Sequence, residues 1–221
     1  MGTLSDSHLY GILDLAYVDR ARLGRIADAM IEGGVDLIQL RGKDASIDEL
    51  TNLAAELHKI TLAASVPLVV NDYAEIACRV PVEGVHVGQD DDSISSVRKR
   101  VGRPLWVGKS THSVDQAIGA RNENADYIGF GPLFRTPTKP DYTPIGLGDI
   151  RRVHDEVEFP IFCIGGIKLS NLEQVIAAGA QRVVIVSGLL QALDIAKYAT
   201  AAKQLLLAAQ ANAPRFKPST T

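Results

Sequence analysis

Cysteine is scarce in this sequence, and a long apolar run and an excess of basic residues are both missing. The two cysteines, Cys78 and Cys163, belong to no Cys-x-x-Cys or Cys/His ligand pattern, which argues against a disulfide framework. No segment approaches the ~18 consecutive apolar residues that a membrane-spanning helix needs. With 23 Lys and Arg against 26 Asp and Glu, the net charge of −3 offers no general attraction for nucleic acid or an anionic membrane. An anionic ligand would therefore need a local cluster of cations.

The remaining composition is that of an ordinary globular protein. The 221 residues are 46% hydrophobic and 22% charged, which suits one domain of 1–221 with a core of about 9–205. Residues 1–8 lack a basic segment followed by an apolar one, so we expect no signal peptide and a cytoplasmic location. Residues 211–221 are polar with two prolines and are expected to fray. The oligomeric state is left open, a homo-oligomer included.

Short apolar runs rich in Val, Ile and Leu alternate with helical patterns along the chain. Eight runs predict strands buried on both faces: Leu9–Asp14, Leu37–Arg41, Leu68–Asp72, Gly84–Gly88, Trp106–Ser110, Tyr127–Gly131, Ile161–Gly166 and Val183–Ser187. Apolar residues at three- and four-residue spacing predict helices at Ala21–Ile31, Ile47–Ala64, Ser113–Glu123, Leu172–Ala178 and Ile195–Ala209, with shorter ones after the third and fourth strands. Ser46 and Glu49 suggest a capping box for the second helix. Eight strand–helix units predict a (β/α)₈ TIM barrel.

An open doubly wound sheet is the rival architecture. Such sheets commonly carry Gly-x-Gly-x-x-Gly after the first strand. Here Asp14-Leu15-Ala16 stands at that place, which favours the barrel.

Polar residues gather where the predicted strands end, the face that carries function in these barrels. The glycine-containing pairs Gly165-Gly166 and Ser187-Gly188 follow the last two strands, where exposed backbone N–H groups can hold a phosphate. Glycine can also serve only to turn the chain tightly, but two such pairs at these two strands favour the phosphate site.

Carboxylates follow the third and fourth strands. Asp72 and one of Asp90, Asp91 and Asp92 should approach a common point, and such carboxylates repel unless a cation such as Mg²⁺ lies between them. The acidic run also suits a helix N-terminus, a role we expect of Asp92. Periodicity alone does not choose among the three.

Arg41, Lys43 and Lys139 form a set of cations near the same face. Arg41 and Lys43 are two residues apart and point to the same side, so with a metal ion they can compensate a pyrophosphate. His86 is expected to be a hydrogen-bonded residue inside the barrel. His112 is either an acid/base group or only a loop residue.

These residues occur in segments that resemble the thiamine-phosphate synthase family over about residues 9–205. The matching segments are Tyr10-Gly11-Ile12-Leu13-Asp14, Gln39-Leu40-Arg41-Gly42-Lys43, Asn71-Asp72, Gly84-Val85-His86-Val87-Gly88-Gln89-Asp90-Asp91, Gly108-Lys109-Ser110-Thr111-His112, Gly129-Phe130-Gly131-Pro132, Thr136-Pro137-Thr138-Lys139, Ile164-Gly165-Gly166-Ile167 and Val186-Ser187. The resemblance implies a transferase that joins 4-amino-2-methyl-5-hydroxymethylpyrimidine pyrophosphate to a thiazole phosphate, giving thiamine phosphate and pyrophosphate.

The resemblance also implies roles for individual residues. Asp72 and Asp91 would be the Mg²⁺ ligands. Ser110, Lys139 and Arg41 would be catalytic. The pyrimidine pyrophosphate would contact Gln39, Leu40, Arg41, Gly42, Lys43, Asn71, Ser110 and Lys139, and the thiazole phosphate would contact Thr136, Pro137, Thr138, Gly166, Val186 and Ser187.

The implied mechanism is dissociative, so it needs positioning and leaving-group stabilisation more than a base. A related thiazole tautomerase, which shares a Ser-x-His-Ser stretch with Ser110 to Ser113, and a non-catalytic sensor of thiamine phosphate are the rival functions. The full ionic set favours the synthase.

Overall fold

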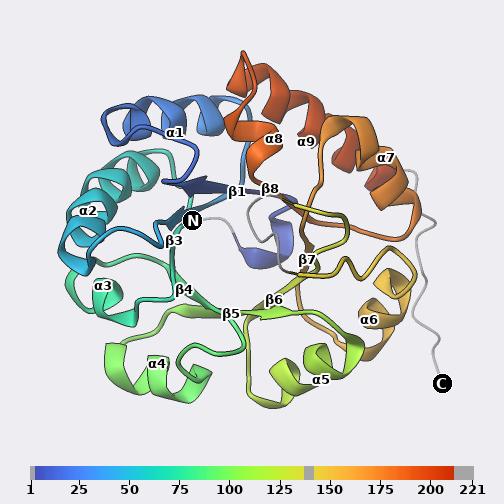
Figure 1. Ribbon diagram of the computed structural model, residues 1–221, viewed down its shortest axis with the longest axis horizontal. Helices are drawn as coiled ribbons and strands as arrows, with labels where there is room; N and C mark the ends of the chain where they lie inside the picture. The colour runs from blue at the N-terminus through green and yellow to red at the C-terminus, as the bar shows by residue number, and fades with distance from the viewer. Residues whose placement is uncertain (1–2, 137–141, 212–221) are drawn as a thin grey trace.

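Eight parallel strands close into a barrel in the computed structural model, which describes residues 3–136 and 142–211. Each strand pairs with its neighbours in chain order, and β1 closes the ring against β8 through Leu9 and Val183. Figure 1 looks down the barrel, with the strands as an inner ring and the helices around it. The strands are β1 Leu9–Asp14, β2 Leu37–Arg41, β3 Leu68–Asn71, β4 Gly84–Val87, β5 Trp106–Thr111, β6 Tyr127–Phe130, β7 Ile161–Cys163 and β8 Val183–Ile185. The closed ring confirms the predicted barrel and excludes the open sheet.

Helices connect the strands on the outside. They are α1 Leu23–Glu32, α2 Ile47–Ala63, α3 Ala74–Arg79, α4 Ile94–Val101, α5 Val114–Asn122, α6 Ile150–Glu156, α7 Leu169–Ala177, α8 Ser187–Leu190 and α9 Ile195–Ala211, with 3₁₀ turns η1 Leu4–Asp6 and η2 Arg20–Arg22. In the described ranges, 3–136 and 142–211, none of these helices is long and apolar enough to cross a membrane.

Alternating strand residues supply two separate apolar clusters. The larger one fills the space between the strands and the helices. The smaller one fills the barrel itself and includes Tyr10, Tyr127 and Phe162, whose rings meet edge to face at centroid distances of 5.4–6.1 Å. Because these rings occupy the interior, the barrel is solid below its mouth and a ligand is confined to the ends of the strands.

The predicted elements are confirmed, and several of their boundaries are corrected. β7 ends at Cys163, three residues before the predicted end at Gly166, because Gly165 and Gly166 take positive φ values of 98° and 67° that turn the chain out of the sheet. Helix α6 was missed, since its single stretch of seven residues buries only Ile150 and Val153. Helix α9 includes Ala211, which corrects the predicted start of the frayed tail at that residue, and residues 212–221 lie outside the described part.

Serine residues cap the first turns of α2 and α4. Ser46 caps α2 by accepting a bond from the Glu49 N–H, as predicted, while the Glu49 carboxylate pairs with Arg20. The expectation that Asp92 caps α4 is wrong. Ser93 is the cap and accepts from the Ser96 N–H, and Asp92 pairs with Arg100 at 2.9 Å.

Candidate active site

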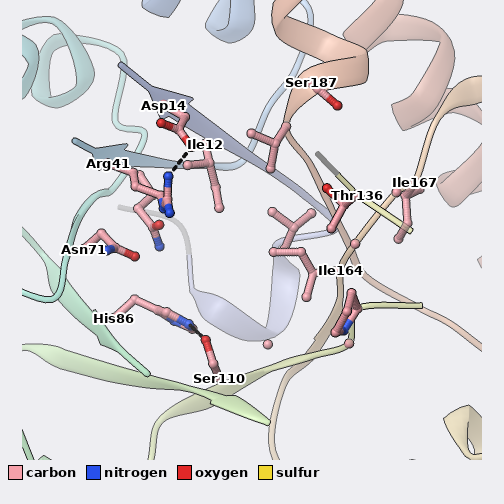
Figure 2. A pocket seen from close by; sticks show the side chains of 18 of the residues that line it. Ile12, Asp14, Arg41, Asn71, His86, Ser110, Thr136, Ile164, Ile167 and Ser187 are labelled. Atoms are coloured by element: carbon pink, nitrogen blue, oxygen red, sulfur yellow. Dashed lines mark hydrogen bonds and ion pairs between the residues drawn. The ribbon is translucent and has the colours of Figure 1, made fainter. Parts of the chain in front are cut away.

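A cavity opens at the carboxyl ends of the strands. Every strand, or the residue after it, contributes to its wall. Figure 2 shows that the wall has two unlike sides: Asp14, Arg41, Asn71, His86 and Ser110 from β1 to β5 face Thr136, Ile164, Ile167 and Ser187 from the later loops. One side is therefore rich in charge and hydrogen-bonding groups, and the other in apolar and hydroxyl groups.

Two carboxylates meet beside this mouth, at the ends of β3 and β4. Asp72 follows β3 with a left-handed φ of 65°, and its carboxylate lies close enough to that of Asp91 for the two to repel each other, which adds to the effect of burial in raising the pKa of Asp72. The Asp91 Oδ2 also accepts a bond from the Gly88 N–H at 2.7 Å, which fixes its orientation. Of the three aspartates of the acidic run, Asp91 is thus the one in contact with Asp72.

Lys43 compensates part of this negative charge. Its Nζ pairs with Asp72 Oδ2, and the Lys43 side chain stays half exposed. Burial raises the pKa of the Asp72 carboxyl above its usual range, Lys43 opposes that rise, and Asp91 adds to it. Partial burial works against the charge on Lys43, but its bond with Asp72 still raises the pKa of Lys43. The Asp72 and Asp91 carboxylates therefore repel each other, and Lys43 offsets part of that repulsion.

Arg41 is anchored at the end of β2. Its Nη1 donates to Asp14 Oδ2 at 2.5 Å, a bond that Figure 2 marks, and Asp14 is 1% exposed. Asp14 Oδ1 accepts a further bond from the Ala16 N–H at 3.1 Å. Arg41 is held rigidly at the cavity wall, and Asp14 offsets part of its charge.

Ser110 reaches the cavity from β5. Its Oγ lies 3.0 Å from Nε2 of His86 on β4, and both residues line the cavity. His86 is buried inside the barrel and makes a second bond to Tyr127, which confirms its predicted character. Elsewhere in the barrel, the amide of Gln39 on β2 donates to the hydroxyl of Tyr10 on β1 at 2.6 Å.

Glycines bring the later loops close together. A Cβ at Gly165 would lie 2.4 Å from Pro132 Cα, and one at Gly166 would lie 2.7 Å from Arg135 O. Tight turning of the chain, the alternative to phosphate binding, is therefore part of the reason for glycine at both positions. The same close approach places Gly166, Val186 and Ser187 with Thr136 along one side of the cavity.

The structure gathers most of the predicted site residues. The residues that line the cavity are Gln39, Arg41, Asn71, Ser110, Thr136, Gly166, Val186 and Ser187. Lys43, Asp72 and Asp91 stand together beside them. Leu40 faces the outer core instead, and a Cβ at Gly42 would lie 2.6 Å from Leu15, so neither offers a side chain to the cavity. Pro137, Thr138 and Lys139 lie outside the described residues.

Some residues at this site were not singled out from the sequence. Tyr10, Asp14 and Tyr127 fall within the predicted strands but have no predicted role, although Tyr10, Ile12 and Asp14 alternate along β1 and so share the inner face. That alternation is the signal that could have found them. His112 also lines the cavity; its Nδ1 bonds the Gly131 carbonyl, and its ring lies 4.8 Å from that of Tyr142.

A metal ion at this mouth would be held by two carboxylates. Within residues 3–136 and 142–211, no group of three or more His, Cys, Asp or Glu side chains is placed to hold a metal. Magnesium, however, is commonly held by one or two carboxylates together with phosphate oxygens and water. The Asp72 and Asp91 pair fits that donor set.

Comparison with known proteins gives one consistent result. A family model described as thiamine monophosphate synthase matches residues 9–189. A thiamine-phosphate synthase of Chloroflexus aurantiacus is 41% identical over 202 residues, 90% of this chain and 91% of that protein, and one of Halalkalibacterium halodurans is 38% identical over 87% and 92%. The solved thiamine phosphate pyrophosphorylase of Pyrococcus furiosus superposes with a TM-score of 0.83 at 28% identity, covering 93% of this chain and 98% of its own.

Proposed function

The chain belongs to the thiamine monophosphate synthase family, and from that premise we propose that its barrel mouth joins a pyrimidinylmethyl pyrophosphate to a thiazole phosphate. The reaction breaks the bond between the pyrimidinylmethyl carbon and a pyrophosphate oxygen, and forms a bond from that carbon to the thiazole nitrogen. The products are thiamine phosphate and pyrophosphate. The observation that carries the proposal is the contact of Asp72 with Asp91 and Lys43 beside a cavity that Arg41 and Ser110 line.

The two sides of the cavity suit the two substrates. The side formed by Arg41, Asn71 and Ser110 offers donors to the pyrimidine pyrophosphate. The opposite side offers Thr136, Gly166 and Ser187, whose hydroxyls and glycine backbone suit the thiazole phosphate. Binding both substrates in one cavity places the thiazole nitrogen next to the carbon that it attacks.

The reaction we propose is dissociative and needs no base. The C–O bond breaks first, the pyrimidine stabilises the resulting carbocation, and the leaving pyrophosphate takes both bonding electrons. Arg41 and Lys43 then attract the growing negative charge, and Ser110 donates a hydrogen bond to it. We propose the same attractive role for Lys139.

Mg²⁺ is the cofactor we propose, held by Asp72 and Asp91. When bound, it would supply positive charge to the pyrophosphate oxygens. Lys43, which is half exposed on a flexible stem beside Asp72, would contact the same pyrophosphate.

We also propose a cytoplasmic location with small phosphorylated substrates and no nucleic-acid or membrane partner. The net charge of −3 offers no general attraction for nucleic acid or an anionic membrane. The two free cysteines, of which Cys163 is buried, suit a reducing compartment.

The test is to mix the purified protein with both substrates and Mg²⁺, and to measure thiamine phosphate and pyrophosphate together. We expect the two products in equal amounts and a strong loss of rate with a chelator. Isomerisation of the thiazole phosphate without condensation would instead identify a tautomerase. Tight binding of thiamine phosphate with no turnover would identify a sensor, and either result would overturn the proposal.

A further inference from the structure

A continuous chain of hydrogen bonds crosses the barrel interior and ends at Ser110. It runs from Gln39 on β2 to Tyr10 on β1 at 2.6 Å, and from there to Tyr127 on β6 at 3.2 Å. The Tyr127 hydroxyl lies 3.2 Å from His86 Nδ1, and His86 Nε2 lies 3.0 Å from Ser110 Oγ. Five side chains from five strands are thus linked, and the last of them faces the cavity.

The direction of this chain follows from counting protons. The Gln39 amide nitrogen can only donate, so Tyr10 accepts there. Among the described contacts, the Tyr127 oxygen is the one acceptor within reach of the single Tyr10 proton, so we take Tyr10 as the donor of that bond. Tyr127 then has one proton left to give, and His86 Nδ1 receives it. A neutral imidazole carries one N–H, so when Nδ1 accepts, the proton stands on Nε2 and is donated to Ser110 Oγ.

Burial and aromatic packing hold the hydrogen-bonded side chains in this arrangement. Gln39 and Tyr10 are 1% exposed and Tyr127 is fully buried, so bulk water does not compete for these bonds. Burial raises the pKa of Tyr10 and of Tyr127, which keeps both hydroxyls protonated. Both rings also contact Phe162 edge to face, with centroids 5.4 and 5.6 Å away. The hydroxyls therefore have fixed positions.

We propose that Tyr127 is a positioning residue that sets His86 in the Nε2–H tautomer and thereby turns the Ser110 proton toward the ligand. Since Ser110 accepts from His86, its own O–H is free to point into the cavity. The proposal deepens the proposed function and rests on it, because a departing pyrophosphate needs a donor there. With the chain reversed, Ser110 would donate to His86 and could not donate to the pyrophosphate.

The first test reads the tautomer directly and needs no substrate. Two-bond ¹H–¹⁵N correlation spectra of the full-length protein, labelled with ¹⁵N-histidine, distinguish the two neutral tautomers. The His86 signal is assigned by its loss in His86→Asn, or by elimination after replacing the other four histidines singly. We expect the proton on Nε2. A proton on Nδ1 would overturn the proposal.

The second test interrupts the chain of hydrogen bonds at Tyr127. In Tyr127→Phe, His86 Nδ1 loses its donor, so we expect a mixture of tautomers, kcat lowered about 10-fold and KM for both substrates within about 2-fold. Tyr10→Phe should have a smaller effect, because the Tyr127 hydroxyl can still reach His86. Thr61→Val is the control: it removes a buried hydroxyl of α2 that bonds only the His58 carbonyl at 3.3 Å among the described contacts, and we expect wild-type kcat and tautomer.

The outcomes separate a positioning role from a merely structural one. If Tyr127→Phe lowers the melting temperature but leaves the His86 tautomer and kcat unchanged, Tyr127 serves packing alone and the proposal is wrong. If the wild-type protein makes no thiamine phosphate, the proposed function fails. The tautomer measurement still decides whether the hydrogen bonds are donated in the direction of Ser110.

Discussion

At the scale of single residues, Arg41 illustrates how one side chain serves both the fold and the site. Its partner Asp14 is 1% exposed, so removal of the arginine leaves a carboxylate buried without a counter-charge. We expect Arg41→Met to lower the free energy of unfolding by about 3 kcal/mol and to abolish most activity. Urea denaturation followed by circular dichroism measures the first effect, and the condensation assay the second.

The double variant Arg41→Met with Asp14→Asn separates these two roles. Without the buried charge, the free energy of unfolding should return to within about 1 kcal/mol of wild type. The activity should stay low, because the guanidinium is still missing from the cavity. Recovery of both stability and activity would show that Arg41 has no part in catalysis.

The acidic run after β4 provides another contrast between neighbouring residues. Asp91 contacts Asp72, whereas the exposed Asp90 has no role in the account. Asp91→Asn keeps an acceptor for the Gly88 N–H but removes a metal ligand, so the rate at saturating Mg²⁺ should fall at least about 100-fold. Asp90→Asn should stay within about 2-fold of wild type. Equal Mg²⁺ dependence in the two variants would refute the assignment of the metal.

At the scale of elements, the contact of β5 with β6 determines where the Tyr127 ring lies. A Cβ at Gly108 on β5 would lie 2.1 Å from Tyr127 Cζ, so Gly108→Ala forces the ring out of its place. We expect a loss of about 1–3 kcal/mol in the free energy of unfolding. Gly119→Ala in α5 is the matched control, since nothing lies within 4 Å of its new methyl group, and it should stabilise by up to about 1 kcal/mol. Denaturant titration of both variants checks the contrast.

The helices and strands also show which parts of the fold can be predicted from the sequence alone. Buried parallel strands need apolar residues on both faces, so runs such as those of β1 and β2 were predicted with their observed bounds. The end of β7 depends on positive φ values at Gly165 and Gly166, which composition does not reveal. Helix α6 was missed because two buried residues in seven make no clear period.

The sequence likewise predicts one part of the site and leaves another part open. The position at the end of a strand brought Asp72, Lys43 and Arg41 to one mouth, because parallel strands end on the same face. Residues alone left open which aspartate meets Asp72; the family resemblance chose Asp91, and the contact between them agrees with that choice. The partners inside the barrel, such as Tyr127 with His86, join distant strands, and no local pattern encodes such pairs.

At the scale of the whole molecule, His154 of α6 links stability to pH. Burial and, after it, Arg182 lower the pKa of His154 from 6.5 to about 4, and its Nε2 has no hydrogen-bond partner within the described part of the chain. The unfolded chain takes up the proton near pH 6.5 and the folded one only near pH 4. The contribution is therefore complete above pH 6.5 and is lost as the pH falls toward 4, by about 3 kcal/mol at most.

His154→Gln removes this titration. Denaturation curves between pH 4 and 8 should show a shallower acid-side loss of stability in the variant, while the two proteins run parallel between pH 7 and 8. The same slope from pH 6.5 to 4 in both proteins would contradict the assignment.

The central claim is that Asp72 and Asp91 hold a divalent cation against a pyrophosphate at the barrel mouth. Crystals grown with Mn²⁺ in place of Mg²⁺ and with pyrophosphate would locate the ion by its anomalous scattering. We predict a peak within coordination distance of both carboxylates, with Lys43 turned from Asp72 to the pyrophosphate. A peak elsewhere, or pyrophosphate bound with Lys43 still on Asp72 and no ion between the aspartates, would contradict the account.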